Sequence, residues 1–137
     1  MKRNLLIILL LFICLASKAQ RIYVEKTDNG YEQPIVDKLL SDNYKITFKK
    51  DSADYIIMCI ISKTGMGRAS GSIAIVNNKN GDLLVKSKEV VGQTAMWNGY
   101  ANPKMACMKK IADKYLIELI NQELHLKNPN SEKNKMP

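Results

Sequence analysis

The residues able to do catalytic chemistry are few and scattered in this sequence. The only histidine, His125, follows Glu123 near the end of the last predicted helix, and a serine or cysteine nucleophile would have to use it as its base. A structural zinc site needs about four ligands, and none cluster around this histidine. The acidic residues are spread over predicted turns and helix faces, where their ordinary role is solvation. We therefore predict no catalytic centre, no metal site and no cofactor.

Two cysteines, Cys59 and Cys107, remain once Cys14 is removed with the leader described below. An even number of cysteines in an exported chain is typical of disulfide pairing, so a bridge between these two is one interpretation. It requires their Cα atoms to lie within about 7 Å of each other. Otherwise Cys59 is an inert core thiol in a strongly apolar segment, and Cys107 is a half-exposed thiol at a helix edge near Lys110 and Lys114. Neither a Cys-x-x-Cys pair nor a neighbouring base supports thiol catalysis.

A glycine-rich segment, Gly65-x-Gly67-x-x-x-Gly71, follows the most apolar stretch of the mature chain. A dinucleotide-binding loop of similar appearance needs a helix amino terminus to hold the pyrophosphate. The residues after Gly71, Ser-Ile-Ala-Ile-Val, have a strand pattern instead. We interpret the segment as a flexible connection between strands, in which Arg68 is either a solvated side chain or a contact for an anion or partner.

The segment Gln93–Asn102 holds the only tryptophan, Trp97, together with Met96 and Tyr100, and has neither strand nor helix periodicity. Aromatic side chains on loops are common anchors for partners or sugars. Trp97 is equally suited to fold back and close the end of the core, because tryptophans are usually well buried. Both interpretations stay open at the level of sequence.

The amino terminus has the pattern of a secretory signal peptide. Lys2 and Arg3 precede an apolar run, and small residues stand at the −3 and −1 positions of a cut after Ala19. The run is shorter than the roughly 20 residues needed to span a bilayer. Bulky Ile13 before Cys14 disfavours lipidation. We predict an exported protein, periplasmic or secreted, with a signal peptide at 1–19, one domain at 20–126 and a disordered polar tail at 127–137.

The charge of the mature chain is only mildly positive. Removal of Lys2, Arg3 and Lys18 lowers the formal net charge from +8 to +5. Nucleic-acid binding usually shows a clustered basic face, which this composition lacks. We expect no nucleic-acid partner, and an envelope protein or glycan as the alternatives.

The elements that must position these residues follow from hydrophobic periodicity. Asp54–Ser62 is a short, isoleucine-rich apolar run, typical of a strand buried on both faces. Asn80-Gly81 between two apolar runs predicts a hairpin turn. The pattern predicts strands at Arg21–Lys26, Tyr44–Lys49, Asp54–Ser62, Ser72–Asn77 and Leu83–Val91, with helices at Tyr31–Asn43 and from Pro103 to about Leu126. The order β-α-β-β-β-β-α with two apolar helix stripes predicts an α+β two-layer sandwich with a mixed sheet of about five strands.

The succession of these elements resembles a group of small envelope domains. The run Ala53-Asp54-Tyr55-Ile56-Ile57 before a glycine-containing turn, the hairpin Asn80-Gly81-Asp82-Leu83-Leu84 and the terminal amphipathic helix carry the resemblance. They are similar to the curli-secretion lipoprotein family and to the amino-terminal domain of the Tol-system propeller protein. Asn77-Asn78 stands where such domains usually carry Asp. The resemblance implies a binding or assembly role at the envelope, without catalytic residues.

We therefore predict an exported, non-enzymatic binding or assembly module of the cell envelope. The alternative is a small secreted hydrolase or inhibitor-like effector, which would use the Trp97 segment or the Gly65–Gly71 segment. A strand buried on both faces also implies that something covers the second face, and a partner protein is one candidate.

Overall fold

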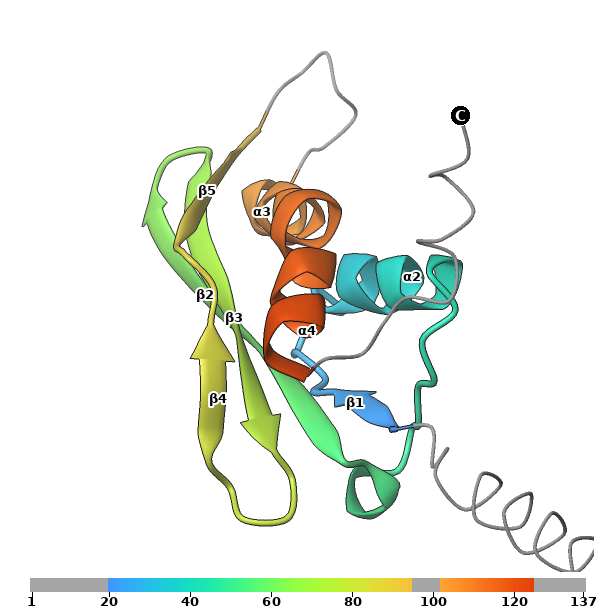
Figure 1. The fold of residues 1–137 in the computed structure, drawn as a ribbon. Helices are drawn as coiled ribbons and strands as arrows, with labels where there is room; N and C mark the ends of the chain where they lie inside the picture. The colour runs from blue at the N-terminus through green and yellow to red at the C-terminus, as the bar shows by residue number, and fades with distance from the viewer. Residues whose placement is uncertain (1–19, 95–101, 125–137) are drawn as a thin grey trace, which may run out of the picture.

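A computed structural model describes residues 20–94 and 102–124, and it confirms the predicted order of elements (Figure 1). The strands are β1 (Ile22–Val24), β2 (Tyr55–Gly65), β3 (Arg68–Asn77), β4 (Leu83–Lys86) and β5 (Val90–Gln93). The helices are α2 (Gln33–Ser41), α3 (Pro103–Ile111) and α4 (Ile117–Leu124), with a π-helical turn at Ala112–Leu116 and a 3₁₀ turn at Lys50–Ser52. The predicted signal peptide and tail lie outside the described residues.

The five strands form one mixed sheet. β1 is parallel to β2, with Ile22 beside Tyr55, and β2 is antiparallel to β3. β4 pairs with one half of β3 and β5 with the other half, so these two short strands follow each other along the same edge. The two central strands of the sheet, β2 and β3, are therefore long, and the strands at both edges are short.

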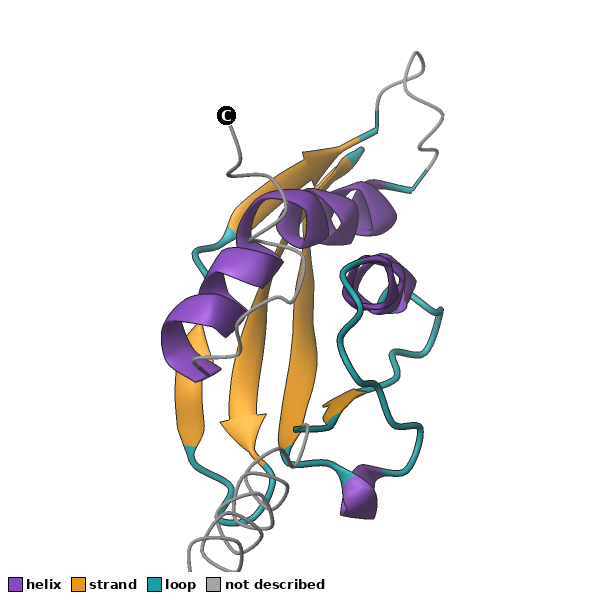
Figure 2. Ribbon diagram, turned by 45° about the vertical axis from the view of Figure 1, so that its right-hand side comes forward, coloured by secondary structure: helices purple, strands orange, loops and turns teal. Residues whose placement is uncertain are grey.

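All three helices lie on one side of this sheet, as Figure 1 and Figure 2 show. Their apolar stripes pack on the isoleucines of the central strands, which gives the predicted two-layer α+β sandwich. Burial of each large apolar side chain contributes about 1.5–3 kcal/mol to folding. The fully buried side chains of this core include Ile57, Ile73, Ile75, Ile35, Leu39, Met108, Ile111, Leu116 and Ile120.

Two predicted strands differ in the structure. In Tyr44–Lys49 only Ile46 forms a bridge, to Ile22, and Phe48 is 78% exposed. The segment turns away because the Thr47 hydroxyl bonds with Ser52 at 2.8 Å, which ties it to the 3₁₀ turn. The predicted strand Leu83–Val91 is split into β4 and β5, since the Ser87 hydroxyl accepts the Ile73 N–H at 2.9 Å.

The glycine-rich segment is a tight hairpin and not a flexible connection. β2 ends at Gly65 and β3 begins at Arg68, so only Met66 and Gly67 form the turn. Gly67 has a φ of 68°, and a Cβ there would meet the Thr94 Oγ1 at 2.8 Å. Glycine is required at this position because of both the left-handed backbone and the close neighbour.

Candidate functional site: the outer face of the sheet

The side of the sheet away from the helices is the candidate site, and we call it the outer face. Side chains alternate between the two faces of a strand. Because Ile57, Ile73 and Ile75 point to the helices, their even-numbered neighbours point outward. The outer face comprises Tyr23 of β1, Ile56, Met58, Ile60 and Ser62 of β2, Arg68, Ser70, Ser72, Ala74 and Val76 of β3, and Leu84, Lys86 and Val91 of the edge strands. Within 20–94 and 102–124, no helix covers it (Figure 2).

The outer face carries exposed apolar side chains, contrary to the prediction that Asp54–Ser62 is buried on both sides. Ile56 is buried, but Met58 is 38% exposed and Ile60 is 40% exposed. On the opposite edge, Val91 is 46% exposed and Leu84 is 37% exposed. Two apolar rows thus flank the central strand β3.

Between these rows lies a floor of small side chains. Ser70, Ser72 and Ala74 are only 3%, 4% and 5% exposed, although no described element lies above them. They are sheltered by the larger side chains on either side. The break between β4 and β5 at Ser87 widens this floor into a hollow of about 400 Å³, lined also by Ile60, Ser62, Gly71, Lys86 and Glu89.

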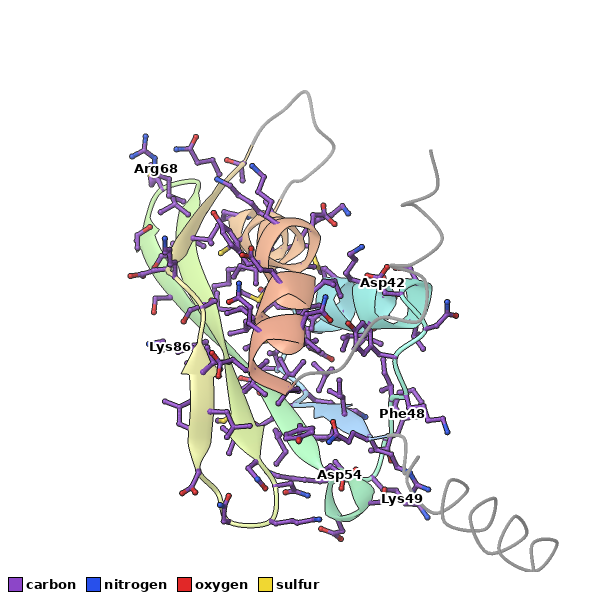
Figure 3. All side chains as sticks on the ribbon, viewed as in Figure 1. Asp42, Phe48, Lys49, Asp54, Arg68 and Lys86 are labelled. Carbon is purple, nitrogen blue, oxygen red and sulfur yellow. The ribbon has the colours of Figure 1, made fainter. Side chains whose placement is uncertain are left out.

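The hollow is polar at its floor and uncharged overall. Ser70 and Ser72 contribute the hydroxyl groups of its lining. Lys86 and Glu89 stand at its rim with one charge of each sign, and Figure 3 shows Lys86 on the side away from the helices. A hydroxyl both donates and accepts, so the arrangement suits a binding partner with apolar contacts at the rows and hydrogen-bonding groups at the centre.

The structure places one of the predicted binding residues at this face. Arg68 is exposed at the end of the β3 row, opposite Gln93 (Figure 3). Met96, Trp97 and Tyr100 lie outside the described residues. The sequence pattern did not lead us to predict a role for the outer-face serines, although the alternation in Ser70-Gly-Ser72-Ile-Ala74 indicates that both serines lie on one face of the strand.

The two cysteines are free thiols in the structure, and their predicted environments are exchanged. Cys107 is fully buried, and its Sγ donates to the Val90 carbonyl at 3.0 Å. It is buried because α3 approaches β5 at Gly92, which closes that side of the helix. Cys59 is half-buried instead. Burial, followed by the charges of Glu32 and Glu25, raises the pKa of the Cys59 thiol to about 12.

A second hollow, of about 500 Å³, lies between α2 and α3, but its lysines are already paired with carboxylates of their own helices. Its lining includes Lys38, Asp37, Lys109 and Asp113. The Lys109 ammonium pairs with the Asp113 carboxylate at 3.2 Å, and Lys38 pairs with Asp42 at 2.9 Å. Each pair joins residues one helical turn apart, and Lys38 and Asp42 are partly buried while Lys109 and Asp113 are about half exposed, so these charges are already paired.

Two kinds of site were sought in the part of the chain that the structure describes, a metal site and a membrane-spanning helix. No group of three or more His, Cys, Asp or Glu side chains there is arranged to hold a metal ion. No helix in those same ranges has the length and apolar content needed to cross a membrane.

Comparison with known proteins finds similar folds only among solved structures. No protein-family model matches the chain, and no curated protein matches it in sequence. A PelC dodecamer from Paraburkholderia phytofirmans is similar at 16% identity and a TM-score of 0.47, over 69% of this chain and 86% of that one. A minor lipoprotein from Acinetobacter baumannii is similar at 7% identity and a TM-score of 0.49, over 76% and 94%. Lipoprotein GNA1162 from Neisseria meningitidis is similar at 10% identity and a TM-score of 0.40, over 77% and 99%. All three TM-scores are below 0.5, and the resemblance to curli and Tol domains stays a prediction.

Proposed function

We propose that this chain is an exported, non-enzymatic binding or assembly module of the cell envelope, and that its partner protein docks on the outer face. The observation that carries the proposal is the pair of exposed apolar rows around Met58 and Ile60 on one side and Val91 and Leu84 on the other. Exposed apolar side chains gathered on one face of a folded protein commonly mark an interaction site. The amino-terminal signal pattern supports export.

The chemistry of the outer face limits what the partner can be. Purely apolar contact over the floor would remove water from the Ser70 and Ser72 hydroxyls without replacing their hydrogen bonds. Each such loss costs about 1–3 kcal/mol. The partner must therefore bring hydrogen-bonding groups to the floor and apolar side chains to the rows, as an amphipathic protein surface does.

Site-directed photo-crosslinking in cells tests the proposal. A photoreactive phenylalanine analogue is placed at position 60 on the outer face, or at position 40 on helix α2, where Leu40 is 53% exposed. We expect position 60 to capture one envelope protein that position 40 does not. A second chain with the analogue at position 91 and Ile60→Asp should lose the same adduct, because a charge then lies in the apolar row.

Two outcomes would contradict the proposal. Equal capture from positions 60 and 40 would mean that contact is not specific to the outer face. Retention of the adduct at position 91 in the Ile60→Asp chain would mean that the apolar rows do not bind the partner. The intact mass of the exported chain, expected to begin at Gln20, checks the signal cleavage in the same material.

A further inference from the structure

The hairpin that joins β2 to β3 ends in the most exposed large apolar side chain of the described residues. Met66 is 94% exposed at its tip, between Gly65 and Gly67. Neither glycine has a side chain, so Met66 has no apolar neighbour within the turn to pack against. A methionine held in water in this way contributes no burial to folding, and it is available to an apolar phase outside the molecule.

The charged side chains next to this tip are both positive. Lys63 and Arg68 are exposed on the two strands that lead into and out of the turn. Because side chains alternate along a strand, Arg68 lies on the outer face and Lys63 on the opposite side of the hairpin. The sequence has no Asp or Glu between Asp54 and Asp82, and the neighbouring strand β5 has no charged residue. The tip therefore combines one apolar side chain with a cation on each side.

Two acidic residues lie toward this end of the sheet, and neither neutralises the tip. Glu89 comes just before β5, about 13 Å along that strand from the residue that pairs with Arg68. Charges in water are screened over about 10 Å at 0.1 M salt. Asp28 lies in a hollow beside β2 whose lining also contains Lys26 and Lys104. The field at the tip is therefore positive.

The backbone of the turn is already hydrogen-bonded, which lowers the cost of moving it out of water. Gly65 pairs with Arg68 across the hairpin, and the Gly67 carbonyl accepts the Thr94 N–H at 2.9 Å. Backbone groups without a hydrogen-bond partner are costly in a lipid environment. A turn of only two residues exposes few of them, so this hairpin can enter an interface without unfolding.

We propose that the β2–β3 tip docks this protein on an anionic lipid bilayer, with Met66 at the boundary between headgroups and acyl chains. Residues advance by about 3.3 Å along a strand, so Lys63 and Arg68 lie about 7–10 Å behind Met66. Apolar side chains that bind a bilayer interface enter it by about 5–10 Å. The two cations therefore reach the lipid phosphates when the methionine reaches the acyl boundary. The strands of the sheet then stand upright on the membrane.

Phe48 shows why exposure alone does not identify the docking surface. It is 78% exposed, and Figure 3 places it at the end of the molecule opposite to Arg68. Its surroundings carry both signs of charge, because Asp51 is close in the chain and the Lys50 ammonium pairs with the Glu25 carboxylate at 3.3 Å. A mixed surface of this kind gains little from a uniformly negative bilayer.

This inference goes beyond the proposed function and does not depend on it. The outer-face partner contacts side chains in the middle of the sheet, such as Met58 and Ile60, whereas the bilayer contacts only the end of the hairpin. With the strands upright on the membrane, the outer face stays open to a partner protein. Loss of one interaction therefore leaves the other measurable.

Co-sedimentation with lipid vesicles tests the proposal. The chain from Gln20 to Pro137 is used, because the apolar run before it would bind lipid by itself. The vesicles consist of phosphatidylcholine alone, or of equal parts phosphatidylcholine and anionic phosphatidylglycerol. We expect binding to the anionic vesicles that weakens with added salt, and binding to the neutral vesicles that is at least about tenfold weaker.

Substitutions at the tip separate its apolar and its charged contribution. Met66→Ser should weaken binding to the anionic vesicles at least about fivefold, because the apolar contact is lost. The double variant Lys63→Gln, Arg68→Gln should weaken it at least about tenfold. Phe48→Ser is the matched control, since it also removes a highly exposed apolar side chain, and it should leave the binding unchanged. Circular dichroism checks that each variant is folded.

Three outcomes would overturn the proposal. Absence of wild-type binding to the anionic vesicles would mean that the tip does not dock on lipid. Equal binding to the two kinds of vesicle would mean that the cations of the tip do not contact the headgroups. A loss in Phe48→Ser or Ile60→Ser as large as that in Met66→Ser would mean that another apolar surface contacts the lipid.

Discussion

Gly92 sets the distance between the last helix and the sheet. A Cβ at this position would overlap the Pro103 carbonyl and the Cys107 N–H, and would lie 2.7 Å from the Cys107 Cα. These are backbone atoms of α3, so no side-chain rotation can relieve the contact. The glycine therefore allows α3 to lie directly on β5, and it is the reason that Cys107 is buried.

We expect Gly92→Ala to destabilise the protein by about 1–3 kcal/mol, because the helix must shift to accept the methyl group. The midpoint of urea unfolding measures the loss. Gly71→Ala is the matched control, since its Cβ would meet the ends of the Met108 and Cys107 side chains at 2.7 and 3.0 Å and the Ile60 carbonyl at 3.0 Å, which are looser contacts than those at Gly92. If both substitutions cost the same, the backbone contact at Gly92 is not what fixes the helix.

Cys59 should be a slow thiol despite its partial exposure. Thiol alkylation proceeds through the thiolate, and a pKa of about 12 leaves very little thiolate at pH 8. We expect iodoacetamide to modify Cys59 in the native chain far more slowly than in the chain unfolded by urea. Glu32→Gln should accelerate the native reaction, because one of the negative charges near the thiol is removed. An unchanged rate in that variant would contradict the electrostatic part of this argument.

At the scale of elements, the sequence predicted best where local chemistry and tertiary structure agree. Asn80-Gly81 forms the predicted hairpin, with Gly81 at a φ of 75°. Pro103 opens the last helix, and the Asn102 side chain caps it by accepting the Lys104 N–H. In both cases the residues that end one element and begin the next act within a few positions, so no distant contact was needed to predict them.

The mispredicted elements depend on contacts far apart in the sequence. Tyr44–Lys49 alternates like a strand, yet β1 is only three residues long and offers it one bridge, at Ile22. Ser87 ends β4 because its hydroxyl reaches Ile73, fourteen positions earlier. Periodicity reports which side chains share a face, but it does not report whether a neighbouring strand is long enough to pair.

The candidate site could not be predicted from the sequence for the same reason. The apolar run Asp54–Ser62 predicted burial on both faces, since Ile56, Met58 and Ile60 are as apolar as Ile57. Whether a face is covered depends on the number of layers in the whole molecule. With all three helices on one side, the second apolar face is left exposed among the described residues (Figure 1).

At the scale of the whole molecule, this arrangement predicts that neighbouring isoleucines of β2 differ sharply in their contribution to stability. Ile57 is fully buried under the helices, so Ile57→Ala should cost about 2–5 kcal/mol. Ile60 is 40% exposed on the outer face, and Ile60→Ala should cost about 1 kcal/mol. Urea unfolding of the two variants, at one protein concentration and alone in solution, measures the difference. Similar losses would mean that the outer face is covered in the isolated protein, and the proposed docking of a partner protein there would lose its basis.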